Sequence, residues 1–237
     1  RSRPRLRCNG HGLSAITRCV RTDAEEGVSW PDLTSERRWR FCLDGEVLVT
    51  EDAGAEYGGN ATTYRTEIDS FARVTSIGTG PDAFEVRTKD GRILSYGRPI
   101  FGGPENLAAA LQRDPYTWPL TQVRDRVGNA MDVIYTLDTL PTDAGPTREY
   151  YPDVIVYTDD NLSITDHALV KFHYKGRNDK LSSYLHGTPV RKTKLLDRIE
   201  TQVESRTVRE YRISYEEADD GARIPRRTRI AVIQECA

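Results

Sequence analysis

The sequence lacks several features that mark common functional classes. Its 237 residues contain no apolar run near the length of a transmembrane helix, so we expect no membrane span in this segment. Neither sign of charge dominates, because 34 Lys and Arg residues face 36 Asp and Glu residues, for a net charge of −2. This balance provides no general attraction to a phosphate backbone, and we expect no nucleic-acid partner.

Signatures of catalysis and metal binding are missing as well. There is no Gly-x-Ser-x-Gly nucleophile motif and no Gly-Lys-Ser/Thr phosphate loop. The four cysteines and four histidines show no zinc-binding spacing. Glu149, Asp153, Asp159 and Asp160 do not form a calcium loop, and Asp159-Asp160-Asn161 is more typical of a turn. We therefore expect no catalytic residue, no cofactor and no metal ion.

Cys19 and Cys42 enclose 22 residues of the chain and could form a disulfide. In an exported protein such a bridge would contribute roughly 3 kcal/mol to the free energy of unfolding. Two small, buried thiols would fit the same sequence equally well. The residues alone leave both alternatives open.

Short β segments joined by glycine-containing turns are what the sequence does have. Three turns carry the pattern: Asp44-Gly45 within residues 38–49, Asp90-Gly91 within 86–97, and Gly128-Asn129 within 123–135. Such pairs supply the positive φ angles that tight hairpins need, and their flanks alternate between apolar and polar residues. We predict that Gly45, Gly91 and Gly128 are turn glycines between antiparallel strands.

The rest of the chain repeats this pattern. Residues 104–113 alone are typical of a helix, with Pro and Glu early and alanines inside. Composition is polar, with 37% hydrophobic and 30% charged residues, as in sheets that have one wet face. We predict an all-β fold, an antiparallel meander of hairpins with one short helix, forming a single module over residues 1–237. Further strands are expected at residues 13–19, 64–69, 71–77, 154–157, 168–174, 195–203 and 208–215.

An ordered series of segments resembles the SpvB-like and Rhs (YD-repeat) bacterial toxin family, including the N-terminal region of the insecticidal toxin complex B component. The series covers nearly the whole chain. It consists of residues 12–19 (GLSAITRC), 41–45 (FCLDG), 64–71 (YRTEIDSF), 88–97 (TKDGRILSYG), 125–129 (DRVGN), 187–191 (GTPVR) and 233–236 (IQEC).

The resemblance implies an excerpt of a much larger secreted or cell-surface protein, which could be stored in the cytoplasm before export. Its role would be structural, within a shell or scaffold that carries a separate toxin domain. Partners would be the downstream repeats and toxin domain of the same parent, and possibly a partner toxin-complex subunit. The alternative is a carbohydrate- or protein-binding module that uses an exposed face. Five tyrosines could form a stacking platform for it, although strand-end tyrosines more often pack between strands: Tyr135, Tyr157, Tyr174, Tyr211 and Tyr215.

Overall fold

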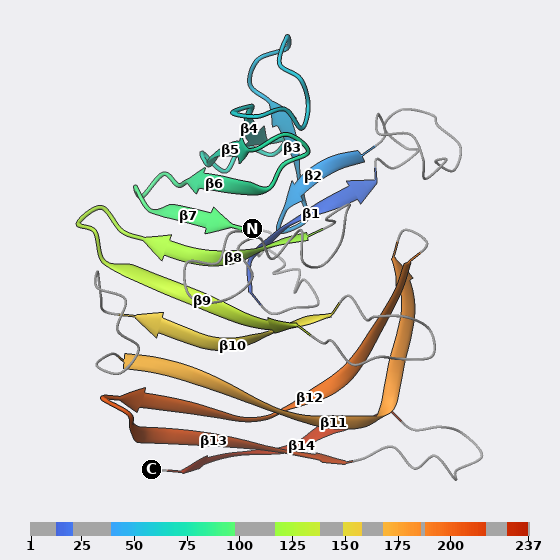
Figure 1. The fold of residues 1–237 in the computed structure, drawn as a ribbon, viewed down its shortest axis with the longest axis vertical. Coiled ribbons are helices and arrows are strands. Elements are labelled where there is room, and N and C mark those ends of the chain that lie inside the picture. The colour runs from blue at the N-terminus through green and yellow to red at the C-terminus, as the bar shows by residue number, and fades with distance from the viewer. Residues whose placement is uncertain are drawn as a thin grey trace, which may run out of the picture. The chain divides into compact units, whose positions relative to one another are not determined.

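All regular elements in the described part of the chain are β-strands, and the registered strand pairs are antiparallel (Figure 1). The prediction of an all-β antiparallel meander is thus confirmed. The helix expected at residues 104–113 lies outside the described residues. The computed structural model describes residues 13–20, 39–97, 117–137, 149–157, 168–185, 188–216 and 227–236.

The chain divides into two compact units, Arg1–Ala130 and Met131–Ala237. Each unit is described by itself. The single module over residues 1–237 that the sequence suggests remains a prediction about the whole chain.

The first unit is a closed ring of eight strands. Each strand pairs with the next along the chain, and β1 also pairs with β8 through Ala15↔Pro119, Ile16↔Trp118 and Thr17↔Thr117. Closure removes both free edges from this sheet, as in a small barrel. The strands are β1 (Ala15–Val20), β2 (Trp39–Leu43), β3 (Glu46–Thr50), β4 (Thr63–Thr66), β5 (Arg73–Ile77), β6 (Ala83–Arg87), β7 (Ile93–Tyr96) and β8 (Thr117–Arg124).

The core of the first unit receives at least one side chain from each of the eight strands. Alternation along the strands produces this arrangement, as in β5, where Val74 is buried while its neighbour Arg73 is exposed. Aromatic residues provide much of the buried volume. The core cluster is Ile16, Phe41, Leu48, Tyr64, Val74, Phe84, Val86, Tyr96, Trp118 and Leu120.

The three turn glycines of the sequence analysis all have positive φ angles. These angles are 92° at Gly45, 81° at Gly91 and 100° at Gly128, and each residue lies between two consecutive strands. The turn at Gly128 is further held by Asp125, whose Oδ1 accepts hydrogen bonds from the backbone amides of Val127 and Asn129. Local sequence is therefore sufficient to shape this turn.

Substituting Gly91 or Gly128 with alanine should lower the free energy of unfolding by about 1 kcal/mol or more at each site, because an L-residue is strained at these φ angles. Gly54→Ala is the matched control, since Gly54 has no positive φ and an added Cβ would approach no closer than 3.5 Å to Asp52. Urea unfolding of the three variants measures the difference. Equal midpoints for all three would contradict the turn assignment.

The second unit contains six strands in chain order. They are β9 (Ala130–Leu137), β10 (Tyr150–Tyr157), β11 (Ala168–Leu185), β12 (Thr188–Val203), β13 (Arg206–Glu216) and β14 (Arg229–Cys236). The β11–β12 hairpin is longer than the sequence pattern predicts, and its register shifts between Gly176 and Leu181. Strand β14, where the sequence analysis predicts no strand, pairs with β13.

Candidate functional site

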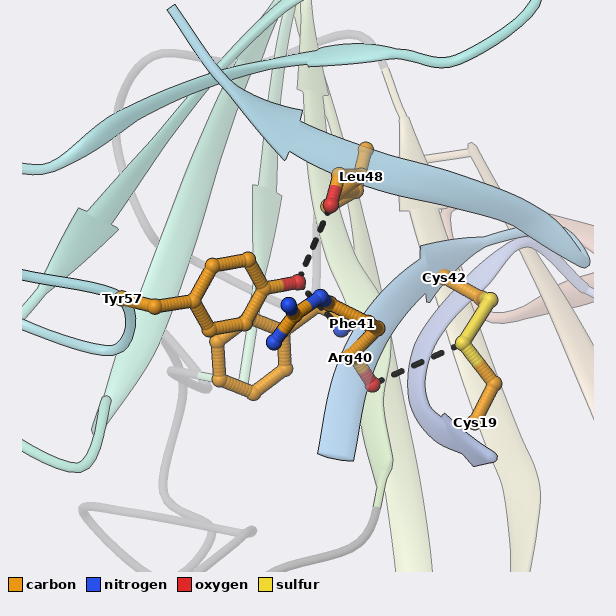
Figure 2. The surroundings of a disulfide bond; sticks show 6 residues. All are labelled: Cys19, Arg40, Phe41, Cys42, Leu48 and Tyr57. Atoms are coloured by element: carbon orange, nitrogen blue, oxygen red, sulfur yellow. Dashed lines mark hydrogen bonds between the residues drawn. A yellow bond between two sulfur atoms is a disulfide. The ribbon is translucent and has the colours of Figure 1, made fainter. Parts of the chain in front are cut away.

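Cys19 on β1 and Cys42 on β2 are joined by a disulfide (Figure 2). The register pairs Cys19 with Arg40 and Thr17 with Cys42, so the two cysteines are diagonal neighbours on paired strands. Their Cα atoms are 5.9 Å apart, within the range that a disulfide requires. Because β1 also pairs with β8, the bond links the strand that closes the ring to the neighbouring β2.

Tyr57 organises the residues next to this bond (Figure 2). Its hydroxyl accepts a hydrogen bond from the amide of Phe41 at 2.7 Å and donates one to the carbonyl of Leu48 at 3.0 Å. Its ring stacks on Phe41 with centroids 5.3 Å apart, and the guanidinium of Arg40 lies 4.7 Å from the ring centre. Cys19 Sγ lies 3.5 Å from the carbonyl oxygen of Arg40. Because a bridged sulfur carries no proton, this is a van der Waals contact and not a hydrogen bond.

Phe41 is also the centre of the aromatic cluster inside the ring. Its ring meets Phe84 at 5.0 Å, Trp118 at 5.4 Å and Tyr64 at 6.0 Å, all in edge-to-face geometry. The indole nitrogen of Trp118 donates a hydrogen bond to the carbonyl of Pro81 at 3.0 Å. These rings are almost completely buried, so they form a packed core and are not available as a stacking surface.

Asp44 has a structural role beyond the Asp44-Gly45 turn. Its carboxylate accepts hydrogen bonds from the Ser14 hydroxyl at 2.7 Å and from the Ala15 amide at 3.0 Å. The Ser14 hydroxyl in turn lies 2.9 Å from that of Tyr96. Burial, together with the nearby charge of Asp44, raises the pKa of Tyr96, which keeps its hydroxyl protonated. No local pattern could have revealed this network, because Ser14 is 30 residues away from Asp44.

The tyrosines of the second unit connect strands. The hydroxyl of Tyr174 donates to the carbonyl of Pro152 at 2.6 Å, and that of Tyr215 donates to the carbonyl of Leu196 at 2.6 Å. Tyr135 packs edge-to-face against Tyr150, with centroids 5.4 Å apart. These contacts use the rings and hydroxyls to hold neighbouring strands together, as amphipathic side chains can. Tyr174 does so from the interior of β11 and not from the strand end at which the sequence pattern places it.

A second long-range contact anchors the irregular part of β11. Asp179 accepts hydrogen bonds from the amide and hydroxyl of Thr228, at 2.9 and 2.7 Å, and its carboxylate lies 3.0 Å from Arg177 Nε. Burial by itself raises the pKa of the Asp179 carboxyl, but the hydrogen bonds from Arg177 and Thr228 outweigh it and hold the pKa well below its usual range. The register shift between Gly176 and Leu181 in β11 is thus tied to the residue just before β14.

The polar cluster nearest to a catalytic arrangement lies across β11 and β12. His173 Nε2 is 3.3 Å from one carboxylate oxygen of Glu200, and Arg198 Nε is 3.0 Å from the other. Neither contact has hydrogen-bond geometry, and Gln202 also donates to Glu200. A His-centred triad requires a nucleophile on the imidazole, and we interpret this cluster as polar contacts that join β11 and β12.

The structure describes only two of the four other acidic residues considered in the sequence. Glu149 is buried, Asp153 is exposed, and Asp159 and Asp160 lie outside the described residues. No group of three or more His, Cys, Asp or Glu side chains is placed to hold a metal ion within the described segments. The same segments contain no helix that is long and apolar enough to cross a membrane.

Comparison with solved structures finds proteins similar to this chain, whereas comparison by sequence does not. No family model matches the sequence, and no curated protein matches it. The N-terminal domain of the effector SpvB from Salmonella typhimurium superposes with a TM-score of 0.67 at 14% identity, over 95% of this chain and 87% of that domain. The Photorhabdus luminescens Tc holotoxin pore superposes with a TM-score of 0.68 at 15% identity.

A structure of TcdB2-TccC3 with Cdc42 also superposes, with a TM-score of 0.66 at 15% identity. This chain is covered over 94% in both toxin-complex comparisons, yet it spans only 13% of the length of those chains. Identities this low establish the architecture and no more. The chain therefore has the fold shared by the N-terminal domain of SpvB and a segment of the TcdB2-TccC3 toxin-complex chains.

Proposed function

We propose that this chain is a non-catalytic structural module of a bacterial toxin protein, contributing to a shell or scaffold that carries a separate toxin domain. The observation that carries the proposal is the superposition of 94% of the chain on a segment that makes up 13% of the toxin-complex chains. A segment that is a small fraction of a large toxin chain is suited to building its body.

The distribution of polar and aromatic residues supports this role. The aromatic rings of the first unit form its core, and the disulfide and Asp44 fasten its closing strand. In the second unit, tyrosine hydroxyls and Asp179 connect segments that are distant in sequence. Each of these groups contributes to the rigidity of the fold, which is what a scaffold needs.

Strand β14 provides the point at which such a scaffold would continue. It ends the strand order of the second unit, so one of its edges has no partner strand in the described part of the chain. Three of its side chains are exposed, with exposed fractions of 57% at Ile230, 56% at Val232 and 60% at Ile233. An apolar edge strand of this kind is a template for pairing with another strand. We infer that further repeats of the same parent polypeptide cover it.

The same proposal places the parent protein outside the cell or on its surface, where an oxidising environment preserves the bond between Cys19 and Cys42. Its partners would be the toxin domain of the parent and a partner toxin-complex subunit.

The purified chain should show no turnover of ester, peptide or glycoside substrates and should not consume NAD, because its sequence contains no catalytic motif and the imidazole of His173 contacts a carboxylate among the described residues. Spectrophotometric assays with each substrate class measure this directly. His173→Ala is the control variant that distinguishes a contaminant from real catalysis. Robust turnover that this or another single substitution abolishes would overturn the structural role.

A further inference from the structure

The β11–β12 hairpin extends beyond the strands that flank it (Figure 1). Strand β10 pairs with β11 only as far as Lys171, and β13 pairs with β12 only from Arg198. Residues 181–185 and 188–192 pair with each other, and no other strand pairs with them in the part of the second unit that the structure describes. We call these two segments the arm. It is a two-stranded ribbon with two open edges.

Contacts on both sides hold the hairpin before the arm begins. On the β10 side, the hydroxyl of Tyr174 donates a hydrogen bond to the carbonyl of Pro152 at 2.6 Å. On the other side, the carboxylate of Asp179 accepts hydrogen bonds from the amide and hydroxyl of Thr228. The arm therefore starts from a fixed base in the sheet.

A two-stranded ribbon of this kind gains little stability by itself. Isolated hairpins are marginally stable in water, and a third strand or packing against another element is needed for independent stability. Each edge of the arm also presents backbone N–H and C=O groups that can pair with another strand. We therefore expect a further strand to complete the arm.

The two edges of the arm differ in the residues that block such pairing. Residues 188–192, on the β12 edge, have the sequence TPVRK, which contains Pro189 and the basic residues Arg191 and Lys192. Proline has no amide to donate, and charged residues on an edge strand oppose the approach of another strand. Residues 181–185, on the β11 edge, have the sequence LSSYL, with no proline and no charge. The β11 edge is thus the one that can accept a partner.

We propose that a strand of the same parent polypeptide pairs with residues 181–185 on the β11 edge of the arm. This inference rests on the proposed function, because it requires the larger parent protein. It goes further by naming a second site of strand addition, on the opposite side of the sheet order from β14.

The small size of the arm favours a strand of the same polypeptide over a separate molecule. A pairing confined to residues 181–185 buries far less than the roughly 1,000 Å² that a specific interface between two proteins needs. A segment tethered to the same chain by a short linker has an effective concentration of about the millimolar range, so a short pairing is sufficient. A second copy of this chain has no such advantage.

Hydrogen exchange tests the proposal by comparing the isolated chain with the polypeptide that carries it in the producing cell. In the isolated chain, the amides of residues 181–185 that point away from β12 should exchange rapidly. In the parent they should slow by about tenfold or more, because pairing removes them from water. The amides of residues 188–192 that point away from β11 are the internal control, and they should exchange equally in both samples.

Ser183→Lys should lower the protection of residues 181–185 in the parent by about tenfold, since it gives the open edge a charge like those of the other edge. Val190→Lys is the matched control, because Val190 is opposite Ser183 in the register but lies on the blocked edge. It should leave the protection unchanged. Circular dichroism of both variants shows that the fold is kept.

Protection of both edges in the parent, or of neither, would overturn the proposal. If neither edge gains protection while β14 does, the scaffold role stands and this inference alone fails; if β14 gains none either, both fail. Slow exchange of residues 181–185 in the isolated chain would also overturn it. So would a dimer of the isolated chain that Ser183→Lys dissociates in sedimentation velocity, since it would assign the edge to a second copy.

Discussion

Trp118→Ala is expected to destabilise the first unit by about 3–5 kcal/mol, which is the largest effect of any single substitution that we predict. Trp118 has no exposed surface, and its ring packs against Phe84 at 5.1 Å and Phe41 at 5.4 Å. It also pairs with Ile16 in the register that closes the ring. The substitution removes these contacts together and leaves the Pro81 carbonyl without its hydrogen-bond donor.

Urea unfolding followed by circular dichroism measures this loss, and Val127→Ala is the control. Val127 is 83% exposed, so its truncation should change the free energy of unfolding by no more than about 0.5 kcal/mol. If Trp118→Ala were as mild as Val127→Ala, the closed ring with a shared aromatic core would be wrong.

Loss of the bond between Cys19 and Cys42 should have the second-largest effect, at about 3 kcal/mol. The bridge constrains the unfolded chain between the two cysteines, and in the folded state it fastens β1, which meets β8 through only three residue pairs. Dithiothreitol should therefore lower the unfolding midpoint of the wild-type protein. The double variant C19A/C42A should start from the lower midpoint and should not respond to the reductant.

Peptide mapping of the oxidised protein without reductant should find the two cysteines linked. Free thiols at both positions after oxidation would contradict the bond, and equal midpoints with and without reductant would contradict its energetic role.

Hairpins could be predicted from sequence because their determinants are local. The turn glycines Gly91 and Gly128, and the alternating residues on either side of them, are consecutive in the chain, and the structure places paired strands around Gly91. The turn acid Asp125 likewise bonds residues within its own turn. For such elements, the main determinants of the turn are adjacent in the sequence.

The closure of the ring could not be predicted, because its determinants are distant. In the first unit, β1 pairs with β8, which comes about a hundred residues later in the sequence. In the second unit, the carboxylate of Asp179 likewise accepts a hydrogen bond from Thr228, 49 residues later. No periodicity or spacing connects such residues. The resemblance to a toxin family suggested a shell-like β architecture, yet it gave no register and no pairing partner for these segments.

Phe71 illustrates a third reason why prediction from the sequence fails. The sequence predicts that a strand begins at Phe71, because an aromatic residue leads an alternating segment. In the structure β5 begins at Arg73, and Phe71 belongs to the turn before it, with a positive φ angle. Alternation cannot distinguish the first residue of a strand from a residue of the turn before it, so the pattern alone places Phe71 in the sheet.

Hydrogen exchange at β14 tests the structural role most directly. The amides of residues 229–236 would be compared between the isolated chain and the polypeptide that carries it in the producing cell, with β5 as the internal reference because both of its edges are paired. We predict that the amides of β14 that point away from β13 exchange rapidly in the isolated chain and become strongly protected in the parent, while β5 exchanges equally in both. Equal exchange of β14 in the two samples would mean that nothing covers this edge, and would contradict a module that continues into a larger scaffold.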